Sequence, residues 1–156
     1  MEKVTKIILI NDKKEFLFQL RDNNSKIVYP GGWSLFGGGI KNGEEILMGL
    51  EREINEEIPD CLVEDIKFVG KGYVEIKDLN LANYWINEEN KSGNFNNFVK
   101  EVHVFKGRIN EKIDLINKKI TEGQKAGYFK LDQFESIGLD NFVKSFIYQN
   151  KYKIFS

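Results

Sequence analysis

The sequence has few of the residues that mark secreted, membrane or nucleic-acid-binding proteins. Cys61 is the only cysteine among 156 residues, so no intrachain disulfide can form and we expect a cytoplasmic protein. The 23 basic and 24 acidic residues nearly cancel, which excludes the basic surplus that charge-driven binding of nucleic-acid polymers requires. The longest aliphatic run, Ile7 to Ile10, is far shorter than a membrane span, and no small-residue cleavage site follows it. We therefore expect no membrane partner and no secretory signal.

The chain does contain enough apolar material for one folded domain. Hydrophobic residues make up 41% of it and charged residues 30%, proportions that argue against disorder. Its length predicts a single domain over residues 1–156. Residues rich in β-branched and aromatic side chains predict strands at 5–10, 16–20, 33–36, 66–76, 98–109 and 127–131. Together with a central and a terminal helix (141–148), they predict an α/β (α+β) fold.

The central helix has the clearest pattern in the sequence. Apolar residues between Ile46 and Ile58 recur with the spacing of one helical face, and Pro59 stops the helix. Asn42 is the expected N-cap. Glu44 and Glu45 are expected in the first turn, where the helix dipole favours negative charge.

Three glutamates lie close together on this helix. Glu53, Glu56 and Glu57 fall within about 100° of one another, because residues three and four apart share a helical face. Like charges this close repel unless a cation neutralises them, and carboxylate oxygens suit Mg²⁺ or Mn²⁺. The alternative is a solvated acidic face that Arg52 balances.

The segment from residue 38 to residue 60 resembles the Nudix box. That motif is a glycine, five residues, Glu, seven residues, Arg-Glu, an aliphatic residue, any residue, Glu-Glu, any residue, Gly and an aliphatic residue. The matching positions are Gly38, Glu44, Arg52, Glu53, Ile54, Glu56 and Glu57. Only Pro59 and Asp60 depart from the pattern, and neither removes a carboxylate. The resemblance implies an α/β/α sandwich with a mixed β-sheet.

The resemblance also implies a chemistry, the cleavage of a nucleoside diphosphate linked to another moiety with the help of Mg²⁺ or, in its place, Mn²⁺. The implied metal ligands are Gly37, through its carbonyl oxygen, Glu53, Glu56, Glu57 and Glu122. Glu53 matches a general base that Arg52 orients, although Glu122 is a second candidate for this role. Glu44 is expected to hold the loop and the helix together.

A second resemblance concerns the substrate. Glu122-Gly123-Gln124 is similar to a segment of MutT-type members, which favours a nucleoside triphosphate cleaved to a monophosphate and pyrophosphate. Arg21 is expected to contact phosphate, with a surface ion pair as the alternative. Asp140 and Asn141 match a base-reading position, or else simply cap the last helix. The backbone at Gly38 and Gly39 is expected to approach the ligand.

Two other functions stay open at this point. A nucleotide-sugar or other diphosphate-linked nucleotide is the alternative substrate within the enzyme class. The alternative outside it is a regulatory module that binds a nucleotide without cleaving it. Every carboxylate of the box is present, which favours the enzyme. In either case the expected partner is a small-molecule nucleotide.

Overall fold

A mixed β-sheet forms the centre of the computed structural model, which describes residues 2–22, 31–75, 84–87, 99–121 and 123–156. The strands are β1 (Glu2–Ile10), β2 (Phe16–Leu20), β3 (Trp33–Ser34), β4 (Phe36–Gly39), β5 (Glu64–Glu75), β6 (Tyr84–Asn87), β7 (Val99–Arg108) and β8 (Lys125–Phe129). Their order is β3-β2-β1-β7-β5-β6, with β4 also paired to β1 and β8 to β2. β1 and β7 run parallel and the other pairs antiparallel.

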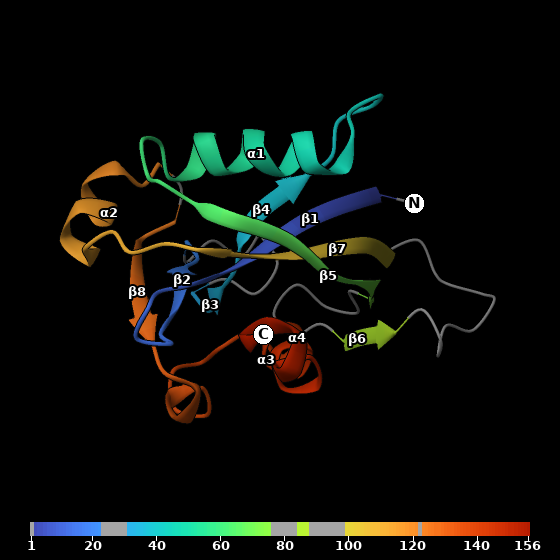
Figure 1. The fold of residues 1–156 in the computed structure, drawn as a ribbon. Helices are drawn as coiled ribbons and strands as arrows, with labels where there is room; N and C mark the ends of the chain where they lie inside the picture. Colours follow the sequence, from blue (N-terminus) through green and yellow to red (C-terminus); the bar gives the residue numbers. More distant parts are fainter. Residues whose placement is uncertain (1, 23–30, 76–83, 88–98, 122) are drawn as a thin grey trace.

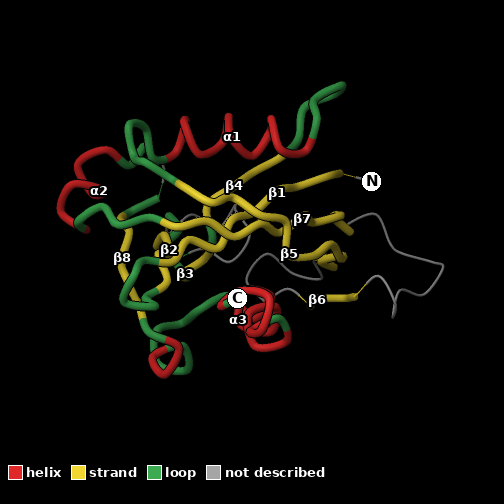
Figure 2. The backbone as a smooth tube through the Cα atoms, viewed as in Figure 1, coloured by secondary structure: helices red, strands yellow, loops and turns green. Residues whose placement is uncertain are grey.

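Helices cover both faces of this sheet. They are α1 (Ile46–Glu57), α2 (Ile113–Lys119), α3 (Asn141–Gln149) and α4 (Lys151–Phe155). α1 lies along one face, whereas α3 and α4 lie on the opposite side (Figures 1 and 2). This arrangement confirms the predicted α/β/α sandwich with a mixed sheet. Among the described residues, no helix has the length and apolar character that a membrane crossing requires.

The alternation of side chains along β1 builds the two cores. Ile7 and Leu9 pack into the cluster beneath α1, whereas Val4 and Ile8 belong to the cluster beneath α3. Successive strand residues point to opposite faces of the sheet, so one strand contributes side chains to both clusters. Lys6 shares the face of Val4 and Ile8 and is partly buried there. The sheet therefore places a lysine on the α3 side, in line with core residues.

The start of α1 differs from the prediction. Glu45, rather than Asn42, is the N-cap residue, and it makes no side-chain capping hydrogen bond. Glu44 and Glu45 thus precede the first turn. The Glu44 carboxylate instead accepts the Lys41 backbone N–H at 3.0 Å and binds Arg52. Helical spacing does not predict the Glu44–Arg52 pair, and this pair joins the loop before α1 to the helix.

The triple glycine forms a strand rather than the end of one. β4 includes Gly37, Gly38 and Gly39, which pair with β1. A side chain at Gly37 would collide with the Thr5 carbonyl oxygen, so the two strands approach closely only because this residue is glycine.

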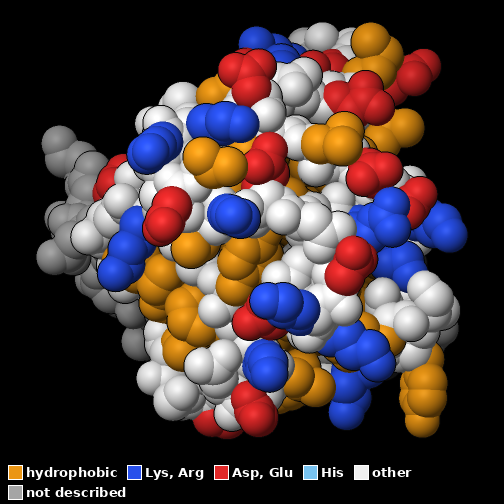
Figure 3. All heavy atoms as spheres, turned by 60° about the vertical axis from the view of Figure 1, so that its left-hand side comes forward, with side chains coloured by type: hydrophobic (Ala, Val, Ile, Leu, Met, Phe, Trp, Pro, Cys, Tyr) orange, Lys and Arg blue, Asp and Glu red, His pale blue; other side chains and the backbone are white. Residues whose placement is uncertain are grey.

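The surface carries both signs of charge. Lys and Arg side chains alternate with Asp and Glu side chains over the face drawn in Figure 3. This mixture is what the near-balance of charge in the sequence leads one to expect.

Candidate active site

A cleft of about 510 Å³ opens on the α3 side of the sheet. Six of the predicted site residues line it: Arg21, Gly37, Gly38, Gly39, Glu57 and Asp140. Charged and polar residues that the sequence analysis did not single out also line it, among them Lys6, Gln19, Ser34 and Lys100. The folded chain therefore brings a carboxylate of the box, the glycine strand and several cations to one cavity.

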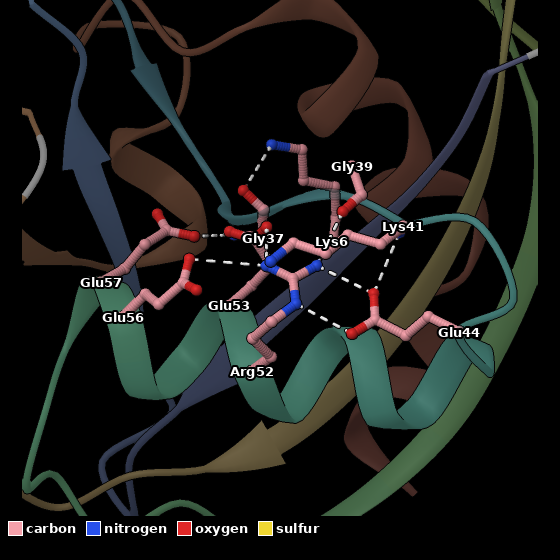
Figure 4. A network of polar contacts seen from close by, with 9 residues as sticks. All are labelled: Lys6, Gly37, Gly39, Lys41, Glu44, Arg52, Glu53, Glu56 and Glu57. Carbon is pink, nitrogen blue, oxygen red and sulfur yellow. Dashed lines mark hydrogen bonds and ion pairs between the residues drawn. The ribbon is translucent and has the colours of Figure 1, made fainter.

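Arg52 connects the loop, the glycine strand and the helix (Figure 4). Its guanidinium binds both oxygens of Glu44, at 2.8 and 2.9 Å. It also donates to Glu53 Oε1 at 2.8 Å and to the Gly39 carbonyl oxygen at 2.9 Å. A weaker contact reaches Glu56 Oε2 at 3.4 Å. One planar, charge-assisted fork thus holds the box in a fixed shape.

These contacts keep the Arg52–Glu44 pair charged. Hydrogen bonds from Arg52, and then from the Lys41 N–H, lower the pKa of Glu44 to about 2. Hydrogen bonds to Glu44 and Glu53 raise the pKa of Arg52 above its usual value. Through these contacts Glu44, in the loop before α1, is joined to Arg52 on the helix.

Glu57 is the most deeply buried carboxylate of the box. Only 1% of the residue is exposed. Its Oε1 accepts the Gly37 N–H at 2.8 Å, and its Oε2 accepts a hydrogen bond from Gln19 Nε2 at 3.3 Å. Gln19 is in turn held by the Leu35 carbonyl oxygen at 2.9 Å. A buried carboxylate needs such partners, and they fix its direction at the cleft.

The oxygen donors on this side of the site fit a hard divalent cation. Glu53, Glu56 and Glu57 supply carboxylates and Gly37 supplies a carbonyl, the ligand type that Mg²⁺ prefers. Across the described ranges, no three acidic, histidine or cysteine side chains converge into a ready-made metal cluster. Protein donors engage the carboxylates instead, although the Glu56 side chain is 52% exposed and can turn. Glu122 lies outside the described residues.

Lys6 is the main residue of the site that the sequence analysis missed. Its Nζ donates to the Gly37 carbonyl oxygen at 3.3 Å, from within the cleft lining. Burial lowers its pKa, and the nearby Glu57 carboxylate opposes that shift. A charged residue on the core-facing side of a predicted strand was the available signal, since Lys6 alternates in phase with Val4 and Ile8.

Asp140 and Asn141, the two residues that match a base-reading position, differ in their position relative to the cleft. Asp140 lines the cleft, whereas Asn141 is exposed and is not among its lining residues. Asp140 also caps α3, because its Oδ1 accepts the Phe142 N–H at 3.0 Å. Arg21 lines the cleft as well, and its buried Nε has no hydrogen-bond partner among the described residues.

Replacing Asp140 by asparagine is expected to stabilise the protein at neutral pH but not in acid. Burial raises the pKa of Asp140 from 3.8 to about 6, against the opposing effects of the Phe142 N–H, Lys6 and Arg21. Between pH 3.8 and about 6, the folded protein therefore holds a proton that the unfolded chain has released. The free energy of unfolding falls as the pH rises through this range. The difference between 3.8 and about 6 corresponds to about 3 kcal/mol in the free energy of unfolding. Asparagine cannot ionise and still serves as an N-cap.

Urea unfolding at about pH 4 and about pH 7.5 measures this difference, since the two pH values bracket the titration. The variant should match the original protein at the lower pH and exceed its free energy of unfolding at the higher one. A difference that does not change with pH would contradict the buried ionisation of Asp140.

Known proteins resemble this chain in sequence and in fold. Residues 2–147 match the sequence profile of the NUDIX domain. The nucleoside triphosphatase NudI of Salmonella arizonae is 41% identical over 56 residues, which cover 36% of this chain and 38% of that protein. The crystal structure of a MutT protein from Methanosarcina mazei Go1 superposes with a TM-score of 0.70 at 19% identity, covering 97% of this chain and 94% of the other.

A further structural relative is the NUDIX domain of Shewanella oneidensis NrtR, complexed with ADP ribose. Its TM-score is 0.66 at 15% identity, covering 97% of this chain and 86% of the other. The two structural similarities establish a shared fold. The NUDIX match over nearly the whole chain establishes more, and this chain belongs to the NUDIX domain family.

Proposed function

We propose that this chain is a Mg²⁺-dependent pyrophosphohydrolase that converts a nucleoside triphosphate to the monophosphate and pyrophosphate. One observation carries the proposal. Glu57 is buried at the cleft with its carboxylate on the Gly37 N–H, beside the Arg52-bound Glu53. That geometry places acidic oxygens and the glycine backbone of the box at one wall of a nucleotide-sized cavity.

The residues of the chain divide the work in this proposal. Glu53, Glu56, Glu57 and the Gly37 carbonyl would hold Mg²⁺, and the metal when bound would neutralise phosphoryl charge and acidify water. Arg52 fixes the direction of Glu53, which is then placed to accept a proton from the attacking water. Glu122 is the alternative base. Mn²⁺, which takes the same oxygen ligands, should substitute for Mg²⁺.

Cationic side chains support a substrate rich in phosphate. Lys6, Arg21 and Lys100 all line the cleft, and within the part of the chain that the structure describes the buried Nε of Arg21 lacks a hydrogen-bond partner. A triphosphate offers more acceptor oxygens to these groups than a diphosphate does. The partial match to a protein named nucleoside triphosphatase points the same way.

Nucleotide-sugar hydrolysis is the second candidate. A structural relative with this fold binds ADP ribose, in which a sugar is attached to the diphosphate. The same relative also motivates the alternative of a binding module without turnover. The retained box carboxylates favour an enzyme over that module.

Product analysis by ion-exchange chromatography tests the proposal. The purified protein with Mg²⁺ is incubated with nucleoside triphosphates, oxidised guanine nucleotides, nucleotide sugars and dinucleoside polyphosphates. We expect a nucleoside monophosphate and pyrophosphate from a triphosphate, and no product after chelation with EDTA. A monophosphate plus sugar phosphate would move the substrate to the second candidate. Nucleotide binding without any cleavage would replace the enzyme with the binding module.

A further inference from the structure

Lys6 and Glu57 each form a hydrogen bond with the backbone of Gly37. The Gly37 N–H donates to Glu57, and the Gly37 carbonyl oxygen accepts from Lys6 (Figure 4). That carbonyl is also the backbone oxygen assigned above to a divalent cation. A lysine ammonium therefore lies where the protein would offer an oxygen to its metal.

The Lys6 ammonium has more hydrogen-bond donors than it uses with the described residues. An ammonium carries three N–H donors, and within the described residues the Gly37 oxygen, at 3.3 Å, is its one hydrogen-bond acceptor. Four charged groups around the cleft act on it: Glu57 from α1, Arg21 following β2, Lys100 from β7 and Asp140 before α3. Counted with Lys6, Arg21 and Lys100 make three cations against two acidic groups, so an added anion is favoured beside Lys6.

We propose that Lys6 is an internal cation that occupies the Gly37 carbonyl in the ligand-free protein and moves to a phosphate of the substrate when a divalent cation binds. This inference rests on the proposed function, because it assumes that a nucleotide phosphate enters this cleft. An ammonium and a divalent cation repel each other strongly when they share one oxygen. The four-carbon stem of lysine lets the charge shift without moving β1.

Coupling between metal and nucleotide follows. A nucleotide that accepts Lys6 frees the carbonyl and so raises the affinity for the metal, and by linkage the metal raises the affinity for the nucleotide to the same degree. Lys6 would then disfavour metal binding to the empty site and favour it once substrate is present.

The test variant is Lys6→Met, which removes the charge and keeps an unbranched side chain. Mn²⁺ binding without nucleotide is followed by electron paramagnetic resonance, which needs no turnover. We expect Lys6→Met to bind Mn²⁺ about tenfold more tightly than the original protein. In EDTA, we expect it to bind a non-hydrolysable nucleoside triphosphate about tenfold more weakly, with nucleoside affinity unchanged. Circular dichroism checks the fold, and Lys6→Gln replaces Lys6→Met if the latter does not fold.

Two controls isolate the charge at this position. Lys3→Met removes an exposed lysine from the same strand and should change neither affinity. Lys6→Arg keeps the charge and should not tighten Mn²⁺ binding. Unchanged or weaker Mn²⁺ binding in Lys6→Met would overturn the inference, as would equal losses for triphosphate and nucleoside. If both affinities shift as expected but the original protein cleaves no triphosphate, only the proposed function fails.

Discussion

Replacing Glu57 by glutamine is expected to lower metal-dependent hydrolysis about 10³-fold while the protein remains folded. A metal ion stabilises developing charge by several kcal/mol, and each 1.4 kcal/mol is a factor of ten in rate. The glutamine side chain can still accept the Gly37 N–H through its carbonyl, although its amide nitrogen cannot accept the hydrogen bond that Gln19 donates to Glu57. It lacks the negative charge that holds a cation. Steady-state kinetics with the preferred nucleotide, together with Mn²⁺ titration, measures both effects.

Glu51→Gln is the matched control for this experiment. Glu51 belongs to the same helix but is exposed to solvent. It should retain the original rate within about twofold, because a surface charge at this distance is screened. Equal rates for the two variants, whether both normal or both impaired, would contradict the assignment of Glu57.

Replacing Gly37 by alanine is expected to destabilise the protein by about 3 kcal/mol or more. Its φ of +132° lies in the region that favours glycine. An added Cβ would collide with the Thr5 carbonyl oxygen and lie 2.8 Å from Lys6 Cα, and both belong to the backbone of β1. Backbone cannot swing aside as a flexible side chain does, so the pairing of β1 and β4 must yield.

Urea unfolding compares this variant with Gly39→Ala. The nearest atom to a Cβ at Gly39 is Glu2 Oε1, at 3.6 Å, an ordinary contact with a movable side chain. We expect Gly39→Ala to change the free energy of unfolding by less than about 1 kcal/mol. Comparable stabilities for the two alanine variants would show that the close approach at Gly37 is not required.

The acidic face of the box was predictable from the sequence because it depends only on spacings within one helix. Three- and four-residue spacings predict Glu53, Glu56 and Glu57 on one helical arc, and in the structure Arg52 contacts the first two while Glu57 is buried. The degree of burial was not predictable in the same way. Glu57 is buried because Gly37 and Gln19 meet it from two strands, and such contacts arise only after the strands pair.

The same reason explains what the sequence did not reveal. Lys6 reaches Gly37 across 31 residues, and no short-range pattern links them. Asn42 was a plausible cap by residue type, yet the pairing of Glu44 with Arg52 moves the start of α1 to Ile46. The short helix α2 was not predicted at all, because seven residues with three charges give a weak helical periodicity.

The Arg52 fork gives the spacing of the sequence motif a physical meaning. Arg52 reaches back eight residues to Glu44 and thirteen to the Gly39 carbonyl oxygen. A guanidinium has a fixed reach, so the chain between these partners must fold to one length. The five- and seven-residue gaps of the box thus set the length of the loop that Arg52 closes. Inserting even one residue there would push an acceptor out of reach, although every motif residue would still be present.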